Sequence, residues 1–90
     1  MRKVAVLTVN YNSEDKTIDF IESLRKSSHK DFEIYIVDNA SSAEGVKKLR
    51  EHISKSNLKI ELIENKNNVG WGLACNQGFK RIEKKNIPYV

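Results

Sequence analysis

The stretch IYIV at residues 34–37 is the feature that most constrains the fold of this 90-residue chain. Its four consecutive apolar residues leave no polar face, and strands of this kind belong inside parallel sheets that are covered on both faces. The run ends at Asp38, which is followed by Asn39 and then by small residues. Because ligands collect at the carboxyl ends of parallel strands, we expect these polar residues to lie at a ligand-binding edge.

Strand and helix patterns alternate along the rest of the chain. Residues 4–9 and 58–63 are also typical of strands. Apolar residues recur at helical spacing after each strand, at Ile18, Ile21 and Leu24, at Val46, Leu49 and Ile53, and at Ala74, Gly78 and Ile82. Right-handed crossovers between these strands predict an α/β fold, a three-layer αβα arrangement with a mostly parallel sheet. Residues 86–90 read as the opening of a fourth strand, so we expect a truncated domain.

Composition excludes several classes of protein. No apolar run approaches the roughly 20 residues of a membrane span. The only cysteine, Cys75, rules out an internal disulfide and offers no metal-site spacing. The net charge of +4 favours anionic partners, but no arginine cluster points to nucleic acid. Polar residues interrupt the first apolar run too early for a signal peptide, so a cytoplasmic location is expected.

Three polar loops follow the predicted strands, at residues 10–12, 38–41 and 65–68. If the strands are neighbours, these loops converge on one rim. An aromatic ring, a carboxyl group and several amides suit a nucleoside, which needs a face for stacking and partners for a base edge and ribose hydroxyls. Simpler interpretations stay open: Tyr11 as a packing residue, and the serines as helix caps. No glycine-rich phosphate loop is present, which weakens a nicotinamide or ATP interpretation.

Segments 4–12, 31–41 and 68–78 together resemble the amino-terminal half of family 2 inverting glycosyltransferases, whose GT-A fold contains a Rossmann-like nucleotide-binding half. The variants NYN and VDNAS are most similar to the branch of rhamnosyl- and galactofuranosyltransferases. The resemblance implies that residues 1–90 are the donor-nucleotide-binding half of the domain and that they end before the family's Asp-x-Asp motif.

The resemblance also implies roles for individual residues. The backbone of Val9 and the ring of Tyr11 would line a uracil or thymine base. Asp38 and Asn39 match the pair that closes the second strand, and the Asn39 carbonyl can accept a hydrogen bond from a pyrimidine N3–H. The full set of nucleotide-binding residues implied is Val9, Tyr11, Asp38, Asn39, Asn68, Gly70 and Asn76. As a rim residue, Asp38 is expected to matter more for donor binding than for folding.

The implied activity is inverting transfer of a sugar from a UDP- or dTDP-type nucleotide-sugar to a glycan or lipid-linked acceptor, as in polysaccharide biosynthesis. The catalytic base, the Asp-x-Asp motif and its divalent Mn or Mg are expected beyond Val90, so residues 1–90 alone should be inactive and hold no metal. A non-catalytic nucleotide-binding α/β module is the alternative. Peripheral association with the cytoplasmic membrane face and a homodimer are left open.

Overall fold

The computed structural model describes residues 4–27 and 31–85, and strand and helix alternate through them as the sequence predicts. The elements are β1 (Val4–Asn10), α1 (Glu14–Arg25), β2 (Phe32–Asp38), α2 (Ala43–Lys55), β3 (Lys59–Glu64) and α3 (Trp71–Lys84). The fourth strand predicted from residues 86–90 lies outside the described residues. None of the helices in the described part of the chain is long and apolar enough to cross a membrane.

The strands form a parallel sheet in the order β1-β2-β3. The register places Asn10 opposite Asp38 and Asp38 opposite Glu64, so all three strands end at the same edge. Strand β2 is central, and its residues 34–37 are each at most 1% exposed. The expectation that the IYIV stretch is covered on both faces is therefore confirmed.

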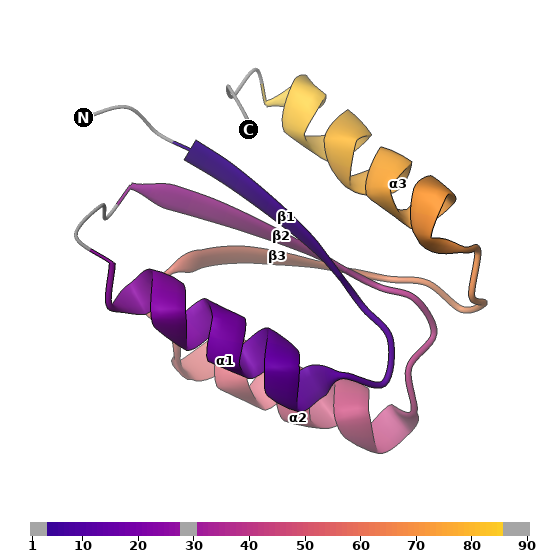
Figure 1. Cartoon of the computed structure of the whole chain (residues 1–90), viewed down its shortest axis with the longest axis horizontal. Helices are drawn as coiled ribbons and strands as arrows, with labels where there is room; N and C mark the ends of the chain where they lie inside the picture. The colour runs from indigo at the N-terminus through magenta and orange to yellow at the C-terminus, as the bar shows by residue number, and fades with distance from the viewer. Residues whose placement is uncertain (1–3, 28–30, 86–90) are drawn as a thin grey trace.

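Helices cover both faces of the sheet (Figure 1). The helices α1 and α2 lie together on one face, and α3 crosses the opposite face over β1 and β2. The core under α1 and α2 contains Ile21, Ile34, Ile36 and Leu49. The core under α3 contains Ala5, Tyr35 and Ile82. The predicted three-layer αβα arrangement is confirmed, with successive strand residues alternating between the two cores.

Glycine allows α3 to approach β1 closely. A Cβ atom on Gly78 would lie 2.2 Å from Cδ1 of Leu7, well inside contact distance. The glycine therefore lets the helix backbone sit directly against the β1 side chains, at the cost of about 1 kcal/mol of helix propensity relative to alanine. This contact sets the distance between α3 and β1.

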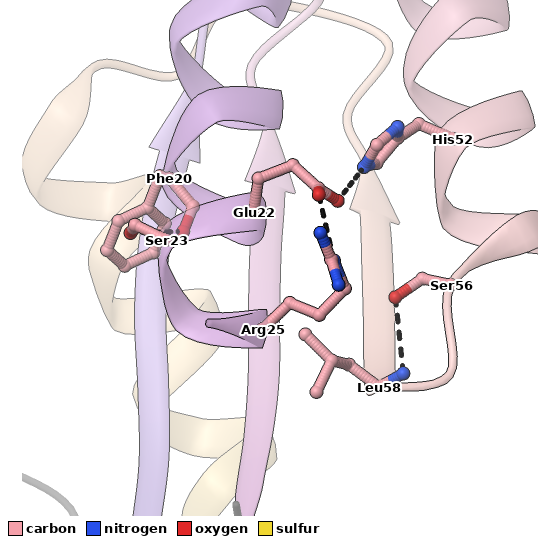
Figure 2. A network of polar contacts seen from close by, with 7 residues as sticks. All are labelled: Phe20, Glu22, Ser23, Arg25, His52, Ser56 and Leu58. Atoms are coloured by element: carbon pink, nitrogen blue, oxygen red, sulfur yellow. Dashed lines mark hydrogen bonds and ion pairs between the residues drawn. The ribbon is translucent and has the colours of Figure 1, made fainter. Parts of the chain in front are cut away.

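Polar contacts join α1 to α2 at the opposite end from the strand carboxyl termini (Figure 2). The Glu22 carboxyl group accepts a hydrogen bond from Nε of Arg25 at 2.8 Å and lies 3.1 Å from Nε2 of His52. The hydrogen bond from Arg25 lowers the pKa of Glu22. Nearby, Oγ of Ser56 accepts from the backbone N–H of Leu58 at 3.2 Å and shapes the turn into β3. These contacts stabilise the end of the fold that is remote from the polar loops.

Candidate functional site

The three polar loops meet at the carboxyl edge of the sheet, as the sequence predicts for neighbouring parallel strands. The backbone N–H of Asn39 donates to the carbonyl of Asn10 at 2.8 Å. The backbone N–H of Asn65 donates to the carbonyl of Asp38 at 2.9 Å. The sheet ladder therefore continues one residue past the ends of β2 and β3 and holds the loops in register.

Asp38 is buried beneath these loops, with 1% of its surface exposed. Its Oδ1 accepts hydrogen bonds from Nδ2 of Asn10 at 2.8 Å and from Oγ of Ser41 at 2.6 Å. Its Oδ2 accepts from the backbone N–H of Ser41 at 3.1 Å. The carboxyl group thus ties the β1–α1 loop to the β2–α2 loop. The expectation that Asp38 is a rim side chain is wrong, because the carboxyl group is covered and both of its oxygens are hydrogen-bonded.

Asn10 stands at the centre of the same network; sequence reasoning placed it in the first polar loop but gave it no role of its own. It is fully buried. Its Oδ1 accepts from Oγ1 of Thr17 at 2.6 Å and from Oγ of Ser13 at 3.3 Å. Its Nδ2 donates to Asp38 and to Oγ of Ser41. Every donor and acceptor of this amide is used. The sequence feature that could have identified Asn10 is a polar residue at the end of an apolar strand.

Two residues of the rim adopt left-handed backbone conformations without being glycine, Asn12 at φ 48° and Ala40 at φ 66°. Such conformations cost on the order of 1–2 kcal/mol each and cluster at functional sites. Asn12 is held by two bonds, from its N–H to Oγ of Ser41 and from the N–H of Ser42 to its Oδ1, both at 2.9 Å. Ser42 also caps α2 by accepting from Gly45 N–H. These contacts hold both sides of the turn that carries position 11.

Tyr11 lies in this turn with 52% of its surface exposed. An exposed ring between two anchored neighbours is available for stacking and does little for the core. Within the described part of the chain, Tyr11 therefore does not pack in the core.

Val9 presents its backbone to the outer edge of β1. In an extended strand the N–H and C=O of one residue point to the same side, and the side alternates with each residue. The Asn10 carbonyl and the Val4 N–H both bond on the β2 side, so the backbone groups of Val9 point away from β2. Among the described residues no strand pairs with that edge. The backbone of Val9 is thus open to a ligand or to another strand.

A groove of about 260 Å³ runs between the outer edge of β1 and α3. Its lining residues are Leu7, Thr8, Val9, Trp71, Cys75 and Phe79. Trp71 is 73% exposed at the start of α3. Burial raises the pKa of the Cys75 thiol, which favours its uncharged form. Cys75 is therefore a small apolar residue in the lining of the groove.

The remaining predicted residues are distributed between the rim and α3. Nδ2 of Asn39 donates to Oδ1 of Asn68 at 2.9 Å, and the N–H of Gly70 donates to the same oxygen at 2.8 Å. Asn76 lies further along α3, where it lines a pocket of about 250 Å³ that also contains Val69. The structure therefore brings Asn39, Asn68 and Gly70 into one network and places Asn76 on the helix beyond it.

The described residues contain no group of three or more His, Cys, Asp or Glu side chains that would hold a metal ion. The carboxyl group of Asp38, which lies beneath the rim loops, has both oxygens occupied by hydrogen bonds. These residues therefore do not fit a divalent-metal site by themselves.

A third cavity, of about 470 Å³, lies along the amino-terminal halves of β2 and β3 on the α3 face. Among the charged side chains that line it, Lys85 pairs with two glutamates: its Nζ lies 3.2 Å from Glu61 and 3.9 Å from Glu33. The same ammonium group lies 5.4 Å from the centre of the Tyr35 ring. The cavity is remote from the carboxyl ends of the strands and is separate from the candidate site.

Relatives of known name align with this chain over nearly its whole length. It is 26% identical over 87 residues to a putative teichuronic acid biosynthesis glycosyltransferase, TuaG, of Bacillus subtilis, covering 97% of this chain and 34% of that protein. It is 29% identical over 92 residues to the poly(ribitol-phosphate) beta-N-acetylglucosaminyltransferase TarS of Staphylococcus aureus, covering 100% of this chain and 16% of that protein. The chain thus spans about a third or less of these relatives.

The fold has a counterpart among solved structures. A mannosyltransferase from Pyrobaculum calidifontis, solved in complex with GDP-Man and Mn2+, superposes with a TM-score of 0.78 and 21% identity, covering 90% of this chain and 25% of that one. The profile of the family described as glycosyl transferase family 2 matches residues 5–90. Motifs, topology and family profile agree, and the chain belongs to glycosyl transferase family 2.

Proposed function

We propose that this chain forms the donor-nucleotide-binding part of an enzyme that transfers a sugar from a UDP- or dTDP-type nucleotide-sugar to a glycan or lipid-linked acceptor with inversion. Membership of the family and the names of the relatives support transfer of a sugar. The relatives named for teichuronic acid biosynthesis and for poly(ribitol-phosphate) also favour a role in polymer biosynthesis. A cytoplasmic location, contact with the membrane face and pairing of two copies stay predictions.

One observation carries the proposal: an exposed aromatic ring stands at the carboxyl edge of a parallel sheet, beside strand backbone that no described strand pairs with. Tyr11 supplies the ring, and Val9 supplies the open N–H and C=O groups. A pyrimidine needs a flat surface for its face and hydrogen-bond partners for its edge. Tyr11 and Val9 together offer the flat surface and the hydrogen-bond partners, only two positions apart in the chain.

The other polar residues give this turn its shape. Asn10 and Asp38 are buried and bonded to each other, so they anchor the loops beneath the base position. Ser41 contacts both Asn12 and Asp38, and so supports the strained backbone at Asn12 and Ala40. A rim that is shaped before the ligand arrives loses less conformational entropy on binding.

A divalent metal fits the proposed chemistry, since it would neutralise the donor diphosphate and the leaving group. The described residues hold no ligand set for it. Its ligands and the base that deprotonates the acceptor hydroxyl are therefore assigned, in this proposal, to residues outside the described part of the chain. The described residues bind and orient the nucleoside.

The test is titration of ¹⁵N-labelled protein with UDP, dTDP, GDP and NADH, read by NMR. We expect pyrimidine nucleotides to shift the amides of Val9 and Tyr11. Tyr11→Ala should weaken pyrimidine binding about 5- to 150-fold, which corresponds to the roughly 1–3 kcal/mol measured for base–aromatic stacking.

Tyr11→Phe is the matched control, because it keeps the ring and removes only the hydroxyl group. It should bind within about twofold of the wild-type protein if stacking is the main contact. Equal dissociation constants for the wild-type and Tyr11→Ala proteins would remove Tyr11 from the site. Absence of any pyrimidine response in the wild-type protein would contradict the proposed function of these residues.

A further inference from the structure

The hydroxyl group of Ser41 joins three parts of the rim through a single atom. It donates a hydrogen bond to Oδ1 of Asp38 at 2.6 Å and accepts one from Nδ2 of Asn10 at 3.1 Å. It also accepts from the backbone N–H of Asn12 at 2.9 Å. A hydroxyl group has one donor and two acceptor positions, so all three are used. Ser41 therefore connects the ends of β1 and β2 to the turn that follows β1.

The bond to Asn12 is the one that makes Ser41 important for the shape of this turn. Asn10 and Asp38 also bond directly to each other at 2.8 Å, so this buried pair stays linked without Ser41. The backbone of Asn12 reaches the buried pair through the Ser41 hydroxyl group. The other anchor of Asn12, the N–H of Ser42, holds its side-chain oxygen. The backbone at position 12 thus depends on the hydroxyl group at position 41.

The backbone of Asn12 in turn sets the direction of the Tyr11 ring. Asn12 has a φ of 48°, a conformation that is unfavourable for residues other than glycine and persists where the surroundings hold it. The Tyr11 ring is 52% exposed, so packing restrains it little. Its direction therefore follows from its two neighbours, the buried Asn10 and the strained Asn12.

We infer that Ser41 is a positioning residue for Tyr11: its hydroxyl group holds the backbone of Asn12 and so directs the ring toward the ligand. The inference rests on the proposed function, in which the ring stacks on a pyrimidine. The contribution of Ser41 to affinity then passes through Tyr11, and the two side chains should act as one unit in binding.

The decisive variant is Ser41→Ala, which removes the hydroxyl group. The protein should still fold, because Asn10 and Asp38 remain bonded to each other and water can reach the exposed N–H of Asn12. The ¹⁵N order parameters of the Tyr11 and Asn12 amides should fall from about 0.85 to about 0.6. UDP should bind about 2- to 10-fold more weakly, which is the effect of losing one hydrogen bond.

Two further serine variants separate positioning from a general loss of stability. Ser56→Ala is the matched control, because Oγ of Ser56 accepts from the backbone N–H of Leu58 at 3.2 Å at the opposite end of the fold. It should destabilise the protein to a similar extent and leave UDP binding unchanged. Ser41→Thr keeps the hydroxyl group at a partly exposed residue and should restore both the order parameters and UDP binding.

A double-mutant cycle tests whether Ser41 acts through Tyr11. Ser41→Ala should weaken UDP binding in the wild-type background and have no further effect in the Tyr11→Ala background, because the ring to be directed is absent. An equal effect in both backgrounds would overturn the inference, since Ser41 would then act through Asp38 or on the nucleotide directly. Equal weakening by Ser56→Ala would also overturn it, because stability alone would explain the result.

The order parameters are measured without nucleotide and so do not depend on the proposed function. Unchanged values in Ser41→Ala would overturn the positioning role, whatever the UDP affinity. Asn12→Gly is the second variant, because it frees the backbone of the turn and leaves the bonds among Asn10, Asp38 and Ser41 in place. It should lower the Tyr11 order parameter, and an unchanged value would refute the link from position 12 to the ring. A wild-type protein that binds no UDP contradicts the proposed function, while the order parameters still decide whether Ser41 holds the turn.

Discussion

Asp38→Asn tests whether the buried network at the end of β2 supports the fold. The substitution keeps the size of the side chain and replaces one oxygen with an NH₂ group. If the NH₂ group takes the place of Oδ2, it meets the backbone N–H of Ser41, which lies 3.1 Å away. If it takes the place of Oδ1, it meets Nδ2 of Asn10 at 2.8 Å. Either orientation sets a donor against a donor in a buried site.

The expected loss of stability follows from the less harmful orientation. With the amide oxygen at Oδ1, the bonds from Asn10 and from Oγ of Ser41 survive, while the Ser41 N–H loses its acceptor and the introduced NH₂ group faces that donor. A buried donor without a partner costs about 1–3 kcal/mol. We therefore expect Asp38→Asn to lower the free energy of unfolding by about 2–4 kcal/mol, and Tm by roughly 10–30 °C for a domain of this size.

Urea unfolding followed by circular dichroism measures this change, and Glu51→Gln on the exposed face of α2 is the control. The control should stay within about 0.5 kcal/mol of the wild-type protein. Sequence reasoning expected Asp38→Asn to impair donor binding more than folding, whereas the burial of Asp38 leads us to expect a large loss of stability as well. A variant as stable as the wild-type protein that has lost nucleotide binding would refute the structural argument.

Two further predictions concern packing and pH. Gly78→Ala should destabilise the protein by about 1–2 kcal/mol, because the added Cβ overlaps Leu7. In a Leu7→Ala background the same change should be neutral or stabilising by up to about 1 kcal/mol. If the two substitutions instead change the free energy of unfolding additively, the overlap is contradicted. The pKa of Glu22 is lowered by the hydrogen bond from Arg25 and by His52, so its contribution to stability is present above the unfolded-state pKa and is lost as pH falls through the folded-state pKa. Glu22→Gln should flatten the decrease in unfolding free energy between about pH 5 and pH 3, and an unchanged slope would show that the contact does not contribute.

Local patterns were sufficient to predict the architecture. An apolar strand with no polar face requires cover on both sides, and the described β2 has that cover. Helical spacing at Val46 and Leu49 predicted one face of α2, and both side chains are buried. These features depend on residues near each other in sequence, so a sequence pattern reports them directly.

The candidate site was only partly predictable. The sequence indicated that the loops after the strands share one rim, because parallel strands with helical crossovers end at the same edge. It indicated a ring at Tyr11, and the structure exposes that ring. It did not indicate which polar side chains are covered, because burial at a strand end depends on the helices packed above it.

The sequence by itself determined the succession of strands and helices along the chain, the α/β class, the parallel sheet and the motifs that mark the family. Only the tertiary structure decided what the polar residues do. Asn10 and Asp38 are 28 residues apart, and Asn39 and Asn68 are 29 apart. Hydrogen bonding between such pairs depends on strand order, register and loop path, which no local pattern contains. For that reason two residues that read as ligand contacts, Asp38 and Asn39, have side chains bonded to the protein itself.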